Sequence, residues 1–290
     1  LLTAHVTGNF GPAEYGGDAG SFARAAPGAH KAVVNNLGEH APDGYEVGIE
    51  CTHHGPTACS TPSMFVELGS GETQWQDAEA ARAIAEAVLD LRGVAADHRP
   101  DGLEAPRHVV GFGGGHYTPR CERIVTETDW AVGHIGAEWQ LDAMGDPAAN
   151  REVIDAAFAA SAAELAVVDG EKPELERVID ELGYRVVSET WLRTVGTRPL
   201  AVVDAAEATL SPVAEGLRFG EVVVDSDGDT DPAEAWTVVS LPDDLIAAAN
   251  GIDADATVAA VAETTIAYET TEGATLPAGR ALVADTAAFE

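Results

Sequence analysis

Short apolar runs alternate with helix-like segments along the first half of this chain, and each run is followed by glycine or polar side chains. The runs with the length and composition of strands are residues 2–6, 45–51, 63–68 and 109–112. The segments with the apolar spacing of helices are residues 22–37 and 77–91. This order is typical of an α/β sheet, in which ligands bind beyond the ends of the strands. We therefore expect an α/β fold in which the strings of polar and glycine residues that follow the strands lie at one site.

The pattern continues to about residue 195. Strands are predicted at residues 130–135 and 165–168, the second of them between helices at 150–166 and 172–183. Residues 185–195 have the composition of a further strand. This part of the chain therefore has enough alternating elements for one α/β domain.

Beyond residue 196 the character of the sequence changes. An acidic loop, residues 225–231, lies between two short β-like runs at 221–224 and 236–241. We expect a small appended α+β region here, described as an acidic C-terminal extension or subdomain. The predicted division is between residues 1–195 and residues 196–290.

Acidic residues dominate the charge of the chain. Asp and Glu number 49 against 16 Lys and Arg, which gives a formal net charge of −33. The acid is spread along the chain, which argues against an acidic tail and favours a protein adapted to high salt, where the self-repulsion is screened. Residues 1–135 carry 8 basic and 18 acidic residues, so the half with the polar strings is the less acidic one.

Three cysteines, Cys51, Cys59 and Cys121, are odd in number and lack a CxxC spacing, as expected for reduced thiols in a cytoplasmic protein. No run of about 18 apolar residues is present, so a membrane span is not expected. No signal peptide is visible. The sequence therefore predicts a cytoplasmic protein without a membrane partner.

An adjacent histidine pair, His53 and His54, follows Glu50 at the end of a predicted strand and precedes Gly55. At a strand end that turns into glycine, both imidazoles can face one cleft, although neighbours within a strand face opposite ways. Neutral imidazole and carboxylate are good Zn²⁺ ligands. The simpler alternative is one core histidine beside one surface histidine.

A second acidic string places Glu67 and Glu72 around the turn Gly69-Ser70-Gly71. Both carboxylates could reach a site at the strand end, one of them as a ligand or general base and the other only to orient a histidine. For Glu72, a solvated turn is an equally good interpretation.

A third string, Gly113-Gly114-Gly115-His116-Tyr117, is the most specific. It lacks the GxGxxG and GxxxxGK[ST] patterns, so a nucleotide-binding loop is excluded. Exposed glycine amides could hold an oxyanion or a terminal phosphate, and His116 could act as a ligand or a proton carrier. Arg120, a nearby cation, could pair with phosphate.

Two isolated histidines, His5 and His134, lie in apolar runs, where a histidine is usually a satisfied core residue. Spacing alone gives neither a role. No GxSxG turn is present, and no cysteine has the context of a nucleophile. Activated water is therefore favoured over a covalent intermediate.

Taken in order, the strings resemble the archaeal and plant type of D-aminoacyl-tRNA deacylase over roughly residues 1 to 195. The matching strings are His5-Val-Thr-Gly-Asn9, Glu50-x-Thr-His-His-Gly-Pro-Thr57, Phe65-x-Glu-x-Gly-Ser70, Gly-x-Gly-Gly-Gly-His-Tyr-x-Pro-Arg120 and Gly133-His134. The resemblance implies a three-layer α/β/α fold with a mixed central sheet, like that of peptidyl-tRNA hydrolases and phosphorylases. It also implies that a segment precedes the first string in other members. We expect the site to be incomplete without that segment.

The resemblance implies hydrolysis of the ester of D-aminoacyl-tRNA by metal-activated water, with Zn²⁺ as cofactor. The expected catalytic residues are His53, His54, His116, Glu50 and Glu67, of which His53, His54, His116 and Glu67 are also the candidate metal ligands. The expected substrate-binding residues are Gly113, Gly114, Gly115, Tyr117, Arg120, Thr57, Asn9 and His134. The expected partner is the acceptor end of the tRNA, bound by a monomer, and not DNA.

Two other functions use the same residues. One is a zinc-dependent peptidase or amidohydrolase that acts on small substrates. The other is a non-catalytic protein that binds RNA ends. Loss of activity on tRNA would favour the first, and retained binding without turnover would favour the second.

Overall fold

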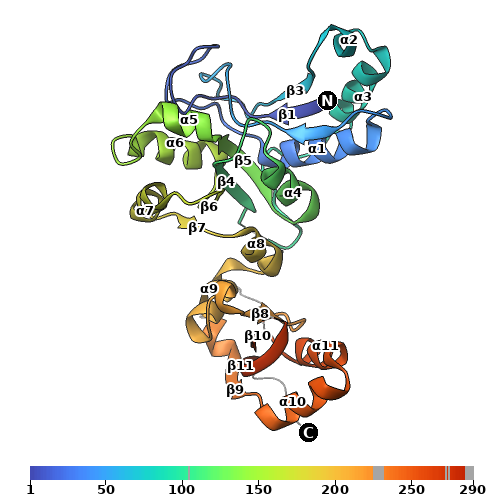
Figure 1. The fold of residues 1–290 in the computed structure, drawn as a ribbon, viewed down its shortest axis with the longest axis vertical. Coiled ribbons are helices and arrows are strands. Elements are labelled where there is room, and N and C mark those ends of the chain that lie inside the picture. The colour runs from blue at the N-terminus through green and yellow to red at the C-terminus, as the bar shows by residue number, and fades with distance from the viewer. Residues whose placement is uncertain (104, 225–231, 272, 274, 285–290) are drawn as a thin grey trace. The chain divides into compact units, whose positions relative to one another are not determined.

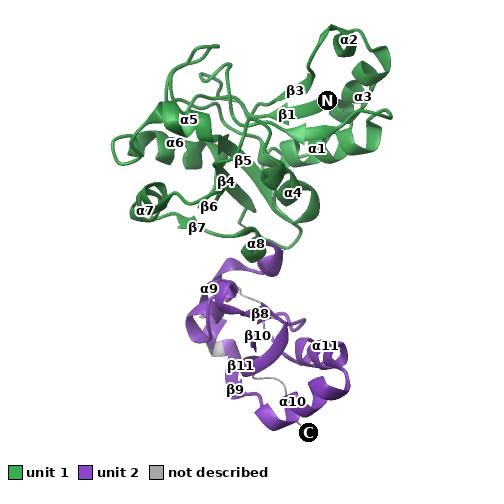
Figure 2. Cartoon of the chain, in the orientation of Figure 1, with its two compact units in different colours: residues 1–192 green, residues 193–290 purple. Residues whose placement is uncertain are grey.

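We describe a computed structural model that covers residues 1–103, 105–224, 232–271, 273 and 275–284 (Figure 1). The chain divides into two compact units, Leu1–Leu192 and Arg193–Glu290 (Figure 2). This boundary lies three residues before the one expected from the sequence. Each unit is an independent arrangement of helices and strands.

The first sheet of unit 1 has the order β2-β1-β3. Strand β1 (Leu2–His5) pairs in parallel with β2 (Val47–Ile49) and antiparallel with β3 (Phe65–Leu68). The pairing of β1 with β3 sets Thr3 opposite Glu67, so the carboxylate comes from the strand next to the one that ends in His5. The first sheet therefore already joins two of the polar strings.

The second sheet of unit 1 is parallel and has the order β5-β4-β6-β7. Its strands are β4 (His108–Phe112), β5 (Ala131–Gly136), β6 (Leu165–Val168) and β7 (Arg185–Val186). A buried cluster around Phe112, Phe158 and Ile179 lies between this sheet and its helices, as expected for a parallel sheet covered by helices.

Hydrogen bonds between the segments that follow the strands connect the two sheets. Cys51 N donates to His116 O at 2.8 Å, Thr118 N to Ile49 O at 3.0 Å, and Thr52 N to Ile135 O at 2.8 Å. The polar string after β2 therefore runs beside the strings after β4 and β5. A mixed α/β fold is confirmed, but the strands of unit 1 lie in two linked sheets where one central sheet was expected.

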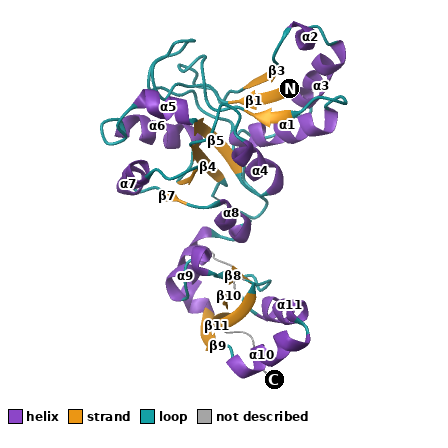
Figure 3. Ribbon diagram, in the orientation of Figure 1, coloured by secondary structure: helices purple, strands orange, loops and turns teal. Residues whose placement is uncertain are grey.

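Eight helices belong to the described part of the chain up to residue 195 (Figure 3). They are α1 (Pro27–His40), α2 (Glu72–Trp75), α3 (Ala78–Leu89), α4 (Pro119–Glu127), α5 (Glu138–Met144), α6 (Arg151–Ser161), α7 (Pro173–Glu181) and α8 (Glu189–Val195). Helix α1 packs against strands of both sheets, and α6 packs against β4 and β5. The predictions for α1, α3, α6 and α7 are confirmed, whereas α4 and α5 were not foreseen.

The prediction of a strand over residues 185–195 is largely wrong. Only Arg185 and Val186 form a strand, and α8 follows them. The Ser188 hydroxyl accepts a hydrogen bond from Trp191 N at 3.0 Å, as at a helix N-terminus. Trp191, Leu192 and Val195 are all buried, and positions i, i+1 and i+4 share one face of a helix but not of a strand.

Unit 2 contains one antiparallel sheet with helices, as an α+β region should. Its strands, in the order β8-β10-β11-β9, are β8 (Arg218–Phe219), β10 (Ala267–Thr271), β11 (Leu276–Ala284) and β9 (Trp236–Ser240). Its helical segments are α9 (Leu200–Thr209), η1 (Val213–Glu215), η2 (Pro232–Ala235), α10 (Asp243–Ile252) and α11 (Ala254–Thr264).

The strand predicted at 236–241 is confirmed as β9, whereas no strand forms at 221–224, where Val223 is 81% exposed. The acidic loop predicted at 225–231 lies outside the described residues. Among the helices that are described, none has the length and apolar character needed to cross a membrane.

Candidate functional site

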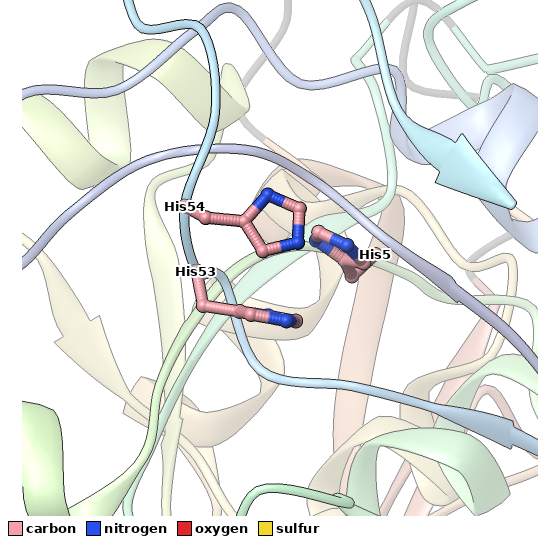
Figure 4. A group of neighbouring side chains, drawn as sticks. All are labelled: His5, His53 and His54. Carbon is pink, nitrogen blue, oxygen red and sulfur yellow. The ribbon is translucent and has the colours of Figure 1, made fainter. Parts of the chain in front are cut away.

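Three histidines from two distant segments gather at one point of unit 1 (Figure 4). His5 is the last residue of β1, and His53 and His54 follow β2. The ring of His5 stacks on His53 with centroids 4.1 Å apart and meets His54 edge-on at 4.8 Å. The parallel pairing of β1 with β2 explains this convergence, because parallel strands end at the same edge of a sheet.

The backbone turn after β2 aims both members of the histidine pair into the site. His54 has a φ of 37° and Gly55 a φ of 53°, so the chain is in the left-handed region at this point. This is the turn into glycine that the sequence indicated. It lets neighbouring side chains face the same cleft, which a regular strand would not allow.

Two glutamates connect the histidines. Glu67 Oε1 lies 3.1 Å from His5 Nε2 and 3.6 Å from His54 Nε2. Glu50 Oε2 lies 3.3 Å from His53 Nε2 and 3.1 Å from His116 Nε2. The structure therefore brings together all five predicted catalytic residues and adds His5 to them.

The histidine pair is held mainly in its neutral form. Burial and the neighbouring His5, His54 and His116 lower the pKa of His53 to about 4, against a hydrogen bond to the Cys51 carbonyl that raises it. Burial first and His5 second lower the pKa of His54, while Glu67 and Glu50 raise it. Neutral imidazole is the form that binds a metal ion.

The donor atoms around His53 have the chemistry of a cation site. His53 Nδ1–H donates to Cys51 O at 2.7 Å, so the neutral ring turns the lone pair of Nε2 toward Glu50 Oε2 at 3.3 Å. Two lone pairs at this distance repel unless a cation or a proton lies between them. A second ring nitrogen bonded to a carbonyl is also the usual support of a metal-ligating histidine.

Three groups of side chains have ligand atoms that all lie within 4.8 Å of one another. They are His5 with His53 and His54, Cys51 with His53 and His116, and His5 with Glu50 and Glu67. Two ligands that each lie about 2 Å from one Zn²⁺ ion are at most about 4 Å apart, so small side-chain movements suffice. The described residues thus fit a metal ion.

A cavity of about 370 Å³ opens onto His53, His54 and His116, and we call it the histidine cavity. The remainder of its wall comes from two segments, residues 9–15 and helix α5. Its full lining is Asn9, Phe10, Gly11, Pro12, Glu14, Tyr15, His53, His54, His116, Trp139, Gln140 and Ala143. The volume is ordinary for a small-ligand site.

Asn9 and Thr57, which were predicted to bind substrate, hold one wall of this cavity. Asn9 Nδ2 donates to Gly16 O at 3.0 Å and to Asp18 O at 3.2 Å. The Thr57 hydroxyl accepts a hydrogen bond from Asp18 N at 2.9 Å. Both side chains therefore fix the loop that carries Tyr15, and Thr57 is not part of the cavity lining.

The predicted substrate-binding glycines lie elsewhere. Gly113, Gly114 and Gly115, with Tyr117 and Arg120, line a second cavity of about 240 Å³, which we call the glycine cavity. A Cβ at Gly113 would lie 2.3 Å from Asp169 O, so this glycine serves close backbone packing. The glycines that were expected to bind substrate therefore line a different cavity from His53, His54 and His116.

Arg120 does not face the histidines either. Its guanidinium donates to Val168 O at 2.9 Å and lies 3.4 Å from Asp169 and 3.8 Å from Glu189. Two carboxylates beside one guanidinium leave little positive charge for a phosphate. The predicted role of Arg120 in binding the substrate is therefore not supported by its position.

His134 supports the site from behind. The ring is fully buried, with Nε2 2.9 Å from Ala23 O and Nδ1 3.1 Å from Thr52 Oγ1. Burial lowers the pKa of His134 to about 4. The ring contacts Thr52, the residue before His53, and it does not line the histidine cavity, so its position does not support direct contact with substrate.

Sequence reasoning missed several residues of the site, among them His5, Tyr15 and Trp139. His5 lies at its centre, and Tyr15 and Trp139 line the cavity. His5 could have been predicted, because it ends a strand and begins His5-Val-Thr-Gly-Asn9, one of the strings that carry the family resemblance. For Tyr15 and Trp139 there was no such signal, since each joins the cavity through a loop or a short helix that the strings do not include.

A family model described as D-aminoacyl-tRNA deacylase matches residues 1–187. A protein of Halorubrum lacusprofundi called D-aminoacyl-tRNA deacylase is 58% identical over 294 residues, which cover 98% of this chain and 58% of the relative. Relatives of the same name from Haloarcula marismortui and Halobacterium salinarum are 53% and 51% identical and are matched over 96% and 100% of this chain.

A solved crystal structure of a conserved protein of unknown function is also similar, with a TM-score of 0.56 at 32% identity, over 66% of this chain and 67% of that one. This chain spans 58 to 61% of the length of the three curated relatives. The match to the family model covers well over half of the chain and includes every residue of the histidine cavity. The chain belongs to the D-aminoacyl-tRNA deacylase family.

Proposed function

We propose that this chain hydrolyses the ester that links a D-amino acid to the terminal ribose of tRNA. The observation that carries the proposal is the convergence of four histidines and two glutamates beside one cavity, in a member of the deacylase family. Ester hydrolysis by water needs a proton acceptor, a proton donor and a polarised carbonyl. The cluster contains groups suited to each of these tasks.

Glu50 and His116 are the proposed acid–base pair. Glu50 is only 7% exposed, and its Oε2 lies 3.1 Å from His116 Nε2. A carboxylate that shares a proton with an imidazole can accept a proton from attacking water and return it to the leaving ribose oxygen. His116 is the more exposed partner and lines the cavity, so it meets the leaving group.

His5, His53, His54 and Glu67 are the residues that would hold Zn²⁺. When bound, Zn²⁺ supplies Lewis acidity that polarises the ester carbonyl. The neutral state of His53 and the hydrogen bond of its Nδ1 to Cys51 O support this assignment. Glu67 contacts both His5 and His54 and keeps their rings in place.

We also infer that unit 1 is the catalytic region and that unit 2 is an accessory region of a chain that acts as a monomer. The finer fold assignment, a three-layer α/β/α relative of peptidyl-tRNA hydrolases and phosphorylases, is part of the same proposal. The packing of α1 against strands of both sheets supports it. The acceptor end of the tRNA is the proposed partner.

The test is deacylation of matched D-tyrosyl- and L-tyrosyl-tRNA by this chain in molar salt, before and after treatment with a chelator and after addition of Zn²⁺. We expect release of D-tyrosine at least about 100-fold faster than of L-tyrosine, loss of that activity with the chelator, and recovery with Zn²⁺. Equal rates on both esters would overturn the proposal in favour of a general esterase or peptidase. Tight RNA binding without turnover would indicate a binding protein.

A further inference from the structure

Exposed aromatic side chains gather around the histidine cavity. Among the described residues, five aromatic side chains are exposed: Tyr15, Phe65, Trp75, Tyr117 and Trp139. Tyr15 and Trp139 line the cavity. Phe65 packs on the rings of His5 and His54, with centroids 5.6 and 5.3 Å apart, and Tyr117 packs on His116 at 5.1 Å. Water-exposed aromatic rings at a cavity mark a surface that a ligand covers.

We propose that Trp139 and Tyr15 form a stacking surface for the unpaired nucleobases at the 3′ end of the RNA. This inference rests on the proposed function, because it identifies how the same site would hold its nucleic-acid substrate. It adds two recognition residues that neither the polar strings nor the family match assigns. Base–aromatic stacking suits a single-stranded end, since every base has a π-face.

The indole of Trp139 is held rigidly enough to serve as a platform. Trp139 lies in the first turn of α5, between two residues whose hydrogen bonds fix the start of this helix. Glu138 N donates to Gly114 O at 2.9 Å, and the Gln140 side chain donates to Thr52 O. The start of α5 is therefore fixed to the segment that carries His53, while half of the indole stays exposed.

Tyr15 is placed by a loop that is itself pinned. Its side chain is 80% exposed, and the next two residues, Gly16 and Gly17, have φ values of 107° and 80°. The hydrogen bonds from Asn9 to Gly16 O and from Asp18 N to Thr57 hold both ends of this turn. The aromatic ring is thus presented at the cavity by a turn of defined conformation.

The charge around the cavity leaves stacking as the main source of affinity. The described residues that line it include Glu14 but neither lysine nor arginine. Glu50 and Glu67 add further negative charge beside the histidines. Phosphate contacts usually dominate the binding of nucleic acids, and this wall cannot supply them. A base, which is uncharged, is the part of RNA that fits here.

Solvent exposure increases from the histidines to the aromatic rings. In the proposal the acyl group therefore lies at the buried histidines and the bases lie at the exposed rings. Side-chain exposure rises from 0% at His5 through 16% at His53 and 27% at His54 to 39% at His116. Trp139 and Tyr15 are more exposed still. A polynucleotide is too large to enter a cavity of about 370 Å³, so its end meets the outer residues first.

The first experiment measures binding of a short single-stranded RNA with the unpaired 3′ sequence of tRNA, without an amino acid, in molar salt. We expect Trp139→Ala and Tyr15→Ala each to weaken binding about 5- to 100-fold, and Trp139→Phe to keep most of the affinity. The matched control is Trp75→Ala, which removes an exposed tryptophan of α2 and should change nothing. Equal binding by Trp139→Ala and Trp75→Ala would overturn the proposal.

The second experiment separates the bases from the amino-acid side chain as the occupant. In deacylation of D-alanyl- and D-tyrosyl-tRNA, Trp139→Ala should raise KM by the same factor for both esters and change kcat less than about threefold. An effect on D-tyrosyl-tRNA alone would show that the rings bind the amino acid instead. Tyr15→Ala, which changes an exposed loop residue, serves as the readout if Trp139→Ala unfolds.

The two proposals fail in different ways. If the chain binds the RNA through Trp139 but hydrolyses no D-aminoacyl ester, the proposed function is wrong and the stacking surface remains. If it hydrolyses the ester while the aromatic variants behave like Trp75→Ala, the stacking surface is wrong and the function remains.

Discussion

The histidine cavity and the glycine cavity both lie where strands of unit 1 end, yet among the described residues only the first is lined by histidines. Residues of the string Gly113–Tyr117 contribute to each: His116 lines the first cavity, whereas Tyr117 and the glycines line the second. The segment pairs with the chain beyond β2, with Glu50 opposite Tyr117. Because neighbours along a paired segment point to opposite faces, one string divides between two cavities.

The two cavities also differ in their electrostatics. In the histidine cavity, burial and neighbouring imidazoles lower the pKa of His53 to about 4. In the glycine cavity, burial raises the pKa of the Cys121 thiol to about 12, so that group stays protonated. The histidine cavity therefore presents the lone pairs of neutral imidazoles to a cation, and it is the one where we expect chemistry.

The largest expected effect is on the deacylation rate, when one carboxylate in each cavity is replaced by the corresponding amide. Glu50→Gln removes the proton acceptor between His53 and His116 and should lower the deacylation rate about 10²- to 10⁴-fold. Asp169→Asn, at the glycine cavity, should change the rate less than about threefold. Steady-state rates with D-tyrosyl-tRNA measure both. Comparable losses in the two variants would show that the cavities act together.

The next effect concerns folding stability. In Gly113→Ala the new Cβ would lie 2.3 Å from Asp169 O at a φ of 96°, which should cost about 3 kcal/mol of unfolding free energy. In Gly114→Ala the nearest atom would be Asp169 Oδ2 at 3.3 Å and φ is 79°, so about 1 kcal/mol is expected. Denaturant unfolding in molar salt measures the difference.

The deacylation activity of Gly114→Ala also tests whether the glycine cavity takes part in catalysis. Since Gly114 lines the glycine cavity, its variant should hydrolyse D-tyrosyl-tRNA at close to the parent rate and with unchanged preference for the D form. A marked loss of that preference would restore the glycines as a wall against the substrate.

Much of this arrangement could be predicted from the sequence, because it follows from local patterns. The strand ends and the turn into Gly55 were enough to bring His53, His54 and Glu67 together. The division of residues 113–117 between the two cavities could not be predicted, since it depends on pairing with a segment more than 60 residues away. Trp139 was missed for the same reason: α5 reaches the site through Thr52, a contact that no local pattern encodes.

A further prediction tests His134, the buried residue behind the histidine cavity. Burial lowers the folded-state pKa of His134 to about 4, whereas the unfolded value is about 6.5. The stability that this neutral ring contributes is therefore complete above pH 6.5 and is lost as the pH falls toward 4, because the unfolded chain binds the proton first. The loss amounts to about 3 kcal/mol.

His134→Gln removes that titration, so its unfolding free energy should fall less steeply than that of the parent between pH 6.5 and 4. The carboxylates titrate equally in both proteins and cancel in the difference. The measurement is chemical unfolding in molar salt at several pH values. Parallel curves for parent and variant would mean that His134 titrates normally in the folded chain.

The smallest expected effect is a change in KM when a hydrogen bond of the loop at the histidine cavity is removed. The comparison is with the hydrogen bond between Thr118 and Ile49 at the glycine cavity. Thr57→Val removes the acceptor for Asp18 N, bonded at 2.9 Å, and should loosen the turn that carries Tyr15. We expect KM for D-tyrosyl-tRNA to rise about threefold with kcat unchanged, which corresponds to about 0.7 kcal/mol. Amide hydrogen exchange of residues 15–18 should become faster in the same variant.

Thr118→Val is the matched change at the glycine cavity, where the hydroxyl donates to Ile49 O at 3.3 Å and is buried. It should lower stability by about 1 kcal/mol, because it leaves a buried carbonyl with one bond fewer, and it should leave KM as it was. If instead Thr118→Val raises KM and Thr57→Val does not, recognition of the RNA end lies at the glycine cavity. The aromatic rings of the histidine cavity would then have to serve the amino acid, since their exposure still requires an occupant.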